Sequence, residues 1–257
     1  MTDKAKIAIW LLVATSSATV LLMMALPVGV RQMTEDFSGY PAGTVVAGDE
    51  PGGGVASGTL FSGFTLSVTN NGGGPHSLVI FDSAAPTGDD PDLGSPNETF
   101  GGPGIGQGGQ AGQPGVNEDA LGNLLVIAED IEDVDPEDGL VDDPDDEAGG
   151  GLVHFDFDEP VLIDAILLVD IDERSRAGIT LFRGSEVAGT TAAGQLGDNS
   201  CEAISLAGFG VATRLEIDLI GSGGIGWIRF GTPPTAADQL SWGRIKALFQ
   251  SPAPSER

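Results

Sequence analysis

Two adjoining stretches of opposite character restrict the possible folds of this chain of 257 residues more than any other feature. Residues 129–147 hold 12 Asp or Glu residues in 19 positions, and the segment after the Gly149–Gly151 run is strongly patterned for β structure. Carboxylates at this density need either bulk water or a bound cation to offset their repulsion. The strands that follow determine where in the fold this charge lies.

The segments after the acidic run predict two strands with different burial. In residues 153–158 apolar residues alternate with polar ones, which is typical of a strand with one buried face and places His154 on the outward face. Pro160 is expected to end this strand, because proline cannot donate to a sheet. Residues 161–172 are almost continuously apolar, which indicates a central strand covered on both sides.

Alternation or short apolar runs predict further strands, separated by Gly, Asn and Pro. Residues 64–69 alternate, and the Asn- and Gly-rich segment 70–75 predicts a hairpin whose return strand is 77–82. Other predicted strands are 124–128, 179–181, 203–206, 215–219 and 225–230. About eight to ten short strands without βαβ alternation predict an all-β fold, a single antiparallel β-sandwich of the jelly-roll type.

The ends of the chain have a different composition from its body. Residues 1–32 form a signal anchor or signal peptide in our interpretation, because Lys4 and Lys6 precede 24 uncharged residues, 7–30, which span about 36 Å as a helix. A retained anchor is favoured over a cleaved signal, and in either case the rest of the chain is exported. The β domain covers 33–232, and 233–257 holds a short amphipathic helix followed by a tail.

The overall charge limits the possible partners. The net charge is −27 with 11 basic residues, so neither nucleic acid nor an anionic membrane surface is an expected partner for the body of the protein. Membrane contact is expected through the N-terminal helix only.

The single cysteine, Cys201, excludes an intrachain disulfide. The G-x-G-x-x-G match at 104–109 has no predicted strand before it and no helix after it, which argues against a dinucleotide site.

The segment 83–122 is a long Gly- and Asp-rich loop within the β domain. Its first part is acidic, whereas residues 101–115 contain 8 glycines in 15 positions and no charge. A loop of this length without regular structure is unusual unless it serves a binding site or is disordered. We expect the acidic half to be ordered and the glycine half to be mobile.

The acids at strand ends are the candidate ligands of a Ca²⁺ ion. Asp170 and Asp172 are two positions apart and should lie on one strand face about 7 Å apart, within reach of one ion. The loops also offer Asp145 and Asp146, but we interpret 131–147 as a mobile acidic loop. The predicted ligands are Asp82, Asp89, Asp90, Asp92, Glu129, Asp130, Asp170 and Asp172. The alternative is that these acids form a solvated surface, as in salt-adapted proteins.

Three blocks, 76–93, 122–130 and 157–173, resemble a signature that recurs in exported bacterial and algal proteins. The resemblance covers roughly 35–230 and implies an extracytoplasmic β-sandwich similar to calcium-dependent, jelly-roll carbohydrate-binding modules. It also implies acids at calcium-like positions. One departure is that no acid stands just before the final predicted strand, where similar modules often carry one.

These observations predict an exported, Ca²⁺-binding and non-catalytic module that binds polysaccharide, a surface glycan, or a cell-surface or matrix component. Two other functions stay open, a purely structural acidic envelope protein and a polysaccharide-active enzyme. No nucleophile signature occurs, and Cys201 has neither a histidine nor a basic residue near it in sequence. The two histidines, His76 and His154, cannot form a zinc site without carboxylate ligands.

Overall fold

The structure is a computed structural model that describes residues 32–88, 90–134, 137–172 and 175–233. The predicted N-terminal anchor, the predicted C-terminal helix and Asp89 lie outside the described residues. Within the described part of the chain, no helix is long and apolar enough to cross a membrane.

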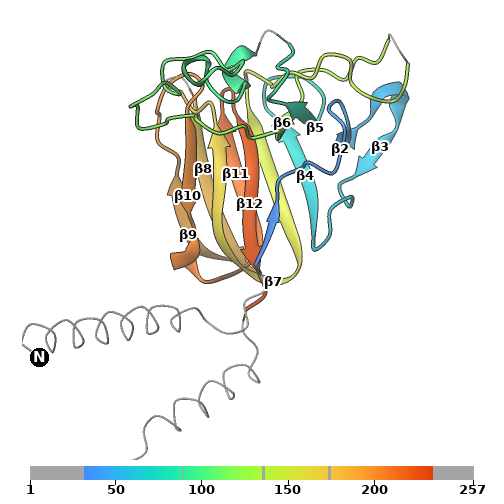
Figure 1. Ribbon diagram of the computed structural model, residues 1–257. Coiled ribbons are helices and arrows are strands. Elements are labelled where there is room, and N and C mark those ends of the chain that lie inside the picture. Colours follow the sequence, from blue (N-terminus) through green and yellow to red (C-terminus); the bar gives the residue numbers. More distant parts are fainter. Residues whose placement is uncertain (1–31, 89, 135–136, 173–174, 234–257) are drawn as a thin grey trace, which may run out of the picture. The chain divides into compact units, whose positions relative to one another are not determined.

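The described residues form an all-β structure, as the sequence predicts (Figure 1). Twelve strands belong to one open sheet, and every pairing between them is antiparallel. The strands are β1 (Gln32–Glu35), β2 (Val45–Asp49), β3 (Val55–Ser57), β4 (Phe64–Asn70), β5 (Ser77–Asp82), β6 (Asn123–Ile127), β7 (Gly151–Val169), β8 (Arg176–Arg183), β9 (Glu186–Ala192), β10 (Cys201–Ser205), β11 (Val211–Ile220) and β12 (Gly224–Gly231). The helical elements of the described residues are short 3-10 turns at Pro51–Gly53, Pro91–Leu93, Glu98–Phe100 and Ala207–Phe209.

Strand β7 organises the sheet, because its two halves have different neighbours. Its first half pairs with β4 and β11, and its second half with β10 and β12. The prediction that Pro160 ends the strand is wrong, since β7 runs through it. Residues 158–160 are exposed and have no partner in the neighbouring strands, so the missing N–H of proline removes no ladder hydrogen bond.

The predicted hairpin of 64–69 and 77–82 is also wrong. Both strands form, but β4 pairs with β7, whereas β5 lies between β2 and β6. Almost all of β5 is buried, which requires a neighbour on each side, while β4 leaves part of its length exposed, as an edge strand can. Strand β9 was not predicted, because its residues are exposed or half-buried and show no apolar period.

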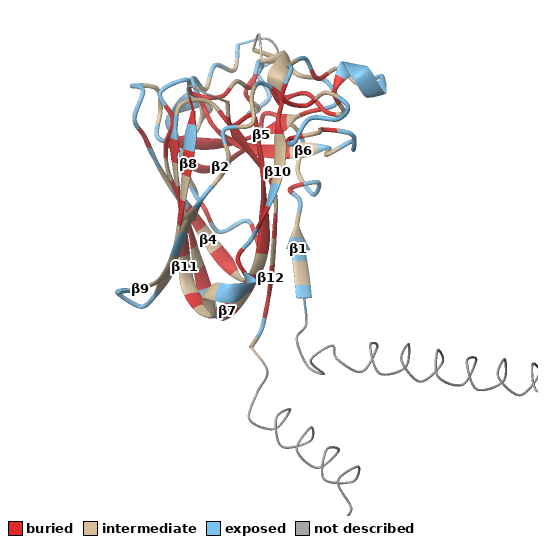
Figure 2. Cartoon of the chain, turned by 90° about the vertical axis from the view of Figure 1, so that its left-hand side faces the viewer, coloured by how far each residue is buried: buried red, intermediate tan, exposed pale blue. Residues whose placement is uncertain are grey.

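Strands β5 and β6 are almost entirely buried (Figure 2). Two apolar clusters cover their opposite faces, which explains why both strands are continuously apolar in sequence. Alternate residues, such as Ile80 and Leu125, join the larger cluster, and Phe81 and Leu124 join the smaller one. The smaller cluster also contains Leu93 and Val141, which come from the two acidic segments. Burial of these loop residues therefore fixes the acidic segments against the sheet.

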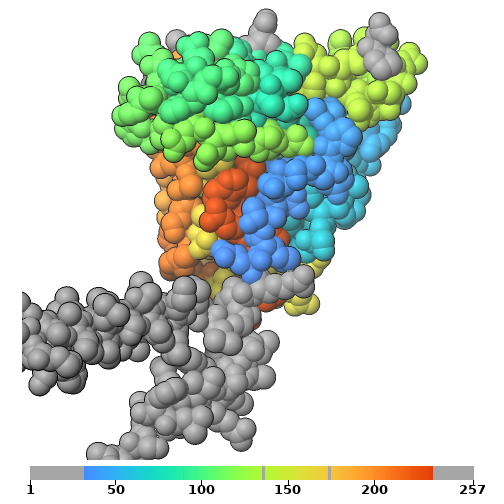
Figure 3. Space-filling model, viewed as in Figure 1, coloured from blue at the N-terminus to red at the C-terminus, as the bar shows by residue number. Residues whose placement is uncertain are grey.

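The long connections gather at one end of the strands, above β5, β6 and β10 (Figures 1 and 3). They comprise residues 83–122 and 128–150. The opposite end is where β1 begins and β12 ends, and Gln32 pairs there with Gly231. The long acidic and glycine-rich connections and the two ends of the β domain thus lie at opposite ends of the strands.

Candidate metal centre

The segment 145–147 is held in place by the end of strand β6. Asp146 forms an antiparallel bridge with Ala128, while the N–H of Glu129 donates to the carbonyl of Asp145 at 3.2 Å. The N–H of Glu147 donates to the carbonyl of Ile127 at 2.8 Å. This end of the acidic run is therefore paired with backbone, contrary to the expectation of a mobile loop across 131–147.

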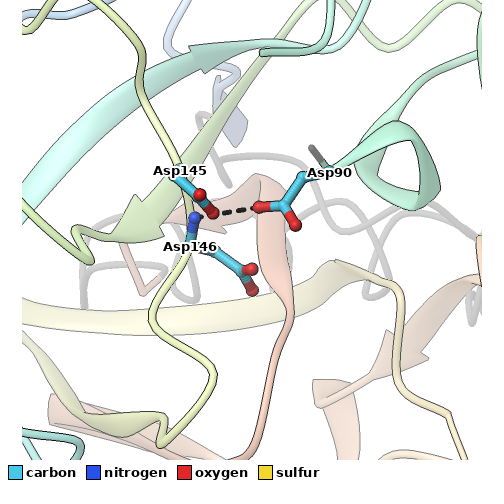
Figure 4. Close-up of side chains that lie close together, drawn as sticks. All are labelled: Asp90, Asp145 and Asp146. Atoms are coloured by element: carbon cyan, nitrogen blue, oxygen red, sulfur yellow. Dashed lines mark hydrogen bonds between the residues drawn. The ribbon is translucent and has the colours of Figure 1, made fainter. Parts of the chain in front are cut away.

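A second acidic segment of the chain brings Asp90 against Asp145 and Asp146. The 3-10 turn Pro91–Leu93 buries Leu93 completely and so sets the position of Asp90 just before it. The N–H of Asp146 donates to Oδ2 of Asp90 at 3.0 Å (Figure 4). Asp90, Asp145 and Asp146 each offer a carboxylate oxygen, and these oxygens lie within 4.8 Å of one another. A cluster of three carboxylates at this spacing can hold a metal ion.

Asp170 extends the cluster from the end of β7. The Ser222 hydroxyl lies 2.8 Å from Oδ2 of Asp146 and 3.3 Å from Oδ2 of Asp170, so it joins the two carboxylates. The N–H of Gly223 also donates to Asp146. Asp170 has a φ of 62°, a left-handed conformation that costs free energy for most residues with a side chain and that Asp tolerates better than most.

The carboxylates of this site are difficult to ionise together. Burial raises the pKa of Asp90 to about 8, and a hydrogen bond from its carboxyl to Asp145 raises it as well. Burial and the charge of Asp92 raise the pKa of Asp170 to about 8. Burial raises the pKa of Asp146 to about 7 and those of Asp92 and Asp145 to about 6, in each case assisted by neighbouring carboxylates. A bound divalent cation would offset this repulsion.

Two buried side-chain oxygens have no hydrogen-bond partner among the described residues. They are Oδ1 of Asp92 and Oδ1 of Asn117, and Asn117 is only 1% exposed. A buried oxygen without a donor is costly and is normally satisfied by water or an ion. The charge of Asp146 contributes to the raised pKa of Asp92, which places Asp92 within electrostatic reach of the cluster.

A surface pocket adjoins the cluster and has a volume of about 630 Å³. Asp90 and Asp145 belong to its wall, together with Asp143 and apolar or small residues of the segment 86–91. Asp146 is 5% exposed and does not line the pocket. An ion at this cluster would therefore have protein on one side and the pocket on the other.

The structure separates the predicted ligands into three groups. Asp90, Asp92 and Asp170 lie at or beside the cluster, and Asp172 is close enough for its charge to raise the pKa of Asp170. Glu129 is exposed and is not one of the three carboxylates, but its side chain is hydrogen-bonded to Asp145 and its charge raises the pKa of Asp145. Asp82 and the exposed Asp130 lie outside the three-carboxylate group. Asp82 caps its own turn by accepting from the N–H of Ala84 at 2.9 Å. Asp89 is outside the described residues.

The expected pairing of Asp170 with Asp172 on one strand face also differs from the structure. β7 ends at Val169, and Asp170 is buried with its Oδ1 accepting from the N–H of Asn199 at 2.6 Å. Asp172 instead accepts from the N–H of Ser175 at 2.7 Å. The left-handed turn at Asp170 breaks the two-residue alternation that the prediction assumed.

Asp145, Asp146 and Ser222 are the site residues that the sequence did not select. Asp145 and Asp146 were recognised as available acids, but no local pattern distinguishes them from the other acids of 129–147. Their position depends on backbone pairing with residues 127–129, which is a tertiary feature. Ser222 lies between two glycines and has no sequence signal of its own.

The described residues show no arrangement typical of nucleophilic catalysis. Burial raises the pKa of Cys201 to about 12, so its thiol is not activated. His154 Nε2 lies 3.0 Å from a carboxylate oxygen of Glu216, and Nδ1 of His76 accepts from the N–H of Asn70. Both histidines thus have other partners, and neither belongs to the three-carboxylate group.

The chain matches no protein-family model, and a search of curated proteins found no significantly similar sequence. The functional interpretation therefore depends on the geometry of the β domain and of its carboxylate cluster.

Proposed function

We propose that the protein is a non-catalytic module that binds Ca²⁺ at Asp90, Asp145 and Asp146, with Asp92 and Asp170 beside them. The observation that carries the proposal is the convergence of three carboxylate oxygens within 4.8 Å of one another, partly buried, from two distant segments. None of the three carboxylates has a Lys, Arg or His partner in the ion pairs of the described residues. A cation is the most direct way to balance this charge.

The chemistry of the donors favours Ca²⁺ over other common metal ions. The cluster offers carboxylate oxygens and no histidine or thiolate, which disfavours zinc and copper. Ca²⁺ takes about six to eight oxygens in flexible geometry, whereas Mg²⁺ requires a nearly ideal octahedron and retains water. Irregular loops and carboxylates from separate segments suit the more flexible ion.

The proposed partner is a polysaccharide, a surface glycan or another cell-surface or matrix component. The pocket supports this proposal, because ligand hydroxyls there can complete the coordination of an ion at Asp90 and Asp145. The described residues of its wall include the carboxylate of Asp143 beside Asp90 and Asp145 and no basic residue, so a neutral polyhydroxy ligand suits it better than an anionic one. The N-terminal sequence supports an exported protein, either anchored or secreted.

The jelly-roll sandwich belongs to the same proposal. It is supported by the change of partners along β7 and by a core to which both halves of that strand contribute. A structural acidic protein and a polysaccharide-active enzyme are the competing functions. The first predicts no specific ion affinity, and the second predicts hydrolysis of a glycan.

Calorimetric titration of the full chain with CaCl₂, together with thermal unfolding in Ca²⁺ and in chelator, tests the proposal. A ligand that binds only the folded state raises its stability by about 2.7 kcal/mol at 100 times its Kd, so a higher melting temperature in Ca²⁺ is expected. Asp146→Asn should weaken Ca²⁺ binding and reduce the shift, whereas Asp130→Asn, a change of an exposed acid outside the cluster, should leave both unchanged. No heat and no shift at millimolar Ca²⁺ would refute the proposal.

A further inference from the structure

The glycine-rich segment 94–117, called here the glycine wrap, packs closely around Asn199. A Cβ at Gly106 would lie 2.3 Å from the carbonyl oxygen of Asp198, and one at Gly109 would lie 2.4 Å from that of Asn199. At Gly104 the nearest atoms include both side-chain polar atoms of Asn199, at 2.8 and 2.9 Å. Glycine is required at these positions because only a residue without Cβ permits such close approach.

Three buried asparagines connect the wrap to the turn at 198–200. Asn97 Nδ2 donates to Asn199 Oδ1 at 2.8 Å, and Asn117 Nδ2 donates to the carbonyl oxygens of Gly94 and Asn199 at 3.1 and 3.4 Å. The three side chains are at most 1% exposed. Since Oδ1 of Asn117 has no partner, this network is not fully satisfied as it stands.

Asn199 is also bonded to two acids of the metal centre. Its N–H donates to Oδ1 of Asp170 at 2.6 Å, and its Nδ2 donates to the carbonyl of Asp92 at 2.6 Å. Both Asn199 and Asp170 have left-handed backbone conformations, with φ values of 59° and 62°. The same residue therefore maintains the position of the acids and the shape of the wrap.

We infer that Asn199 couples ion binding to the conformation of the glycine wrap, so that Ca²⁺ orders this segment. The inference rests on the proposed function, because it requires an ion at the carboxylate cluster. An ion that draws in Asp170 and Asp92 restrains Asn199 from both sides, and Asn199 in turn restrains Asn97 and Asn117. The wrap exposes Ile105, Gln107 and Gln113, so its order or disorder changes the surface that it presents to solvent.

Coupling of two sites is reciprocal, which gives the inference two independent readouts. Ca²⁺ must protect the amides of the wrap, and loosening the wrap must weaken Ca²⁺ binding even though the altered residue offers no ligand. Gly106→Ala suits the second test, because the new Cβ would meet the carbonyl of Asp198. Gly208→Ala is the matched control, since nothing lies within 4 Å of a Cβ at that position.

The first experiment is hydrogen–deuterium exchange of the unaltered full chain in saturating CaCl₂ and in chelator. Slower exchange in Ca²⁺ is expected for peptides covering 94–117, with β9 peptides unchanged as the internal reference. The second is calorimetry of the two variants, in which Gly106→Ala should lower the Ca²⁺ affinity about tenfold and Gly208→Ala should not change it. The exchange experiment needs no variant, so a poorly folded Gly106→Ala protein leaves the inference testable.

The outcomes separate this inference from the proposed function. Ca²⁺ binding by calorimetry without protection of 94–117 overturns the coupling and leaves the proposed function intact. Absence of any Ca²⁺ binding overturns both. Protection of the wrap together with the expected difference between the two glycine variants supports the coupling.

Discussion

The N–H of Asp146 donates to a carboxylate oxygen of Asp90 across 56 positions of the chain, at 3.0 Å. The bond brings one acidic segment against the other, and the two segments would otherwise repel. It also leaves the side chain of Asp146 directed to Ser222 and Gly223 on the inner side of the cluster. These hydrogen bonds explain how the carboxylate cluster is held together inside the fold and is not simply a set of solvated surface acids.

The first prediction concerns the contribution of single acids to ion affinity. Asp146→Asn or Asp90→Asn should weaken Ca²⁺ binding on the order of 100-fold, because ligand charge determines the affinity of calcium sites. In chelator, at a pH above these raised pKa values, the same variants should be at least as stable as the unaltered protein, since each then removes a buried charge that is repelled by its neighbours. Calorimetry and urea unfolding measure the two effects, and a variant with unaltered affinity would exclude that residue as a ligand.

The second prediction is a pH dependence of stability without the ion. The folded state raises the pKa values of Asp90 and Asp170 from 3.8 to about 8 and that of Asp146 to about 7. Between pH 3.8 and the raised pKa values, the folded state holds protons that the unfolded state has released. The free energy of unfolding therefore falls as the pH rises through this range. The melting temperature in chelator should therefore decrease from pH 5 to pH 8, and less so for Asp170→Asn. A rising melting temperature over this range would contradict the account.

The third prediction tests the close approach of Gly88 to Asp145. A Cβ on Gly88 would lie 2.6 Å from Cβ of Asp145, whereas one on Gly52 would have nothing within 4 Å. Both glycines have a positive φ, of 64° and 75°, so alanine should cost about 1 kcal/mol of backbone strain at either position. Only Gly88→Ala should also displace Asp145 and lower the Ca²⁺ affinity, by about tenfold. Equal affinities for the two variants would show that the cluster tolerates this displacement.

The fourth prediction links the smaller apolar cluster to the site. Leu93 is fully buried beside the acids of its own turn, so Leu93→Ala should cost about 2 to 5 kcal/mol and weaken Ca²⁺ binding as well. Leu60→Ala is the control, because Leu60 is 49% exposed and should cost less than about 0.5 kcal/mol. Urea unfolding and calorimetry give both values. Full Ca²⁺ affinity in a destabilised Leu93→Ala protein would show that burial of Leu93 does not position the acids of the site.

Most of the strands could be predicted from the sequence because burial leaves a periodic pattern. The alternation in β4 and the apolar runs of β5 and β6 identify these strands by their residues alone. Their pairing could not be predicted, since the Asn- and Gly-rich turn after β4 is equally compatible with a hairpin and with a crossing to another part of the sheet. The exposed edge strand β9 has no apolar pattern from which to predict it.

The candidate site was predicted only in part, for a related reason. Asp90, Asp92 and Asp170 follow or flank buried segments, so their location at strand and turn ends could be inferred. Asp145 and Asp146 owe their position to pairing with the end of β6, which the composition of 129–147 does not reveal. The glycine wrap was expected to be mobile because glycine is flexible in isolation, whereas here its lack of Cβ permits close packing on Asn199.

The most direct test of the central claim is a crystal structure of the protein grown in millimolar CaCl₂, with anomalous diffraction to identify the ion. The account predicts an anomalous peak at about 2.3 to 2.6 Å from carboxylate oxygens of Asp90, Asp145 and Asp146. A well-ordered cluster without such a peak, or calcium bound only at exposed acids such as Asp130, would contradict it.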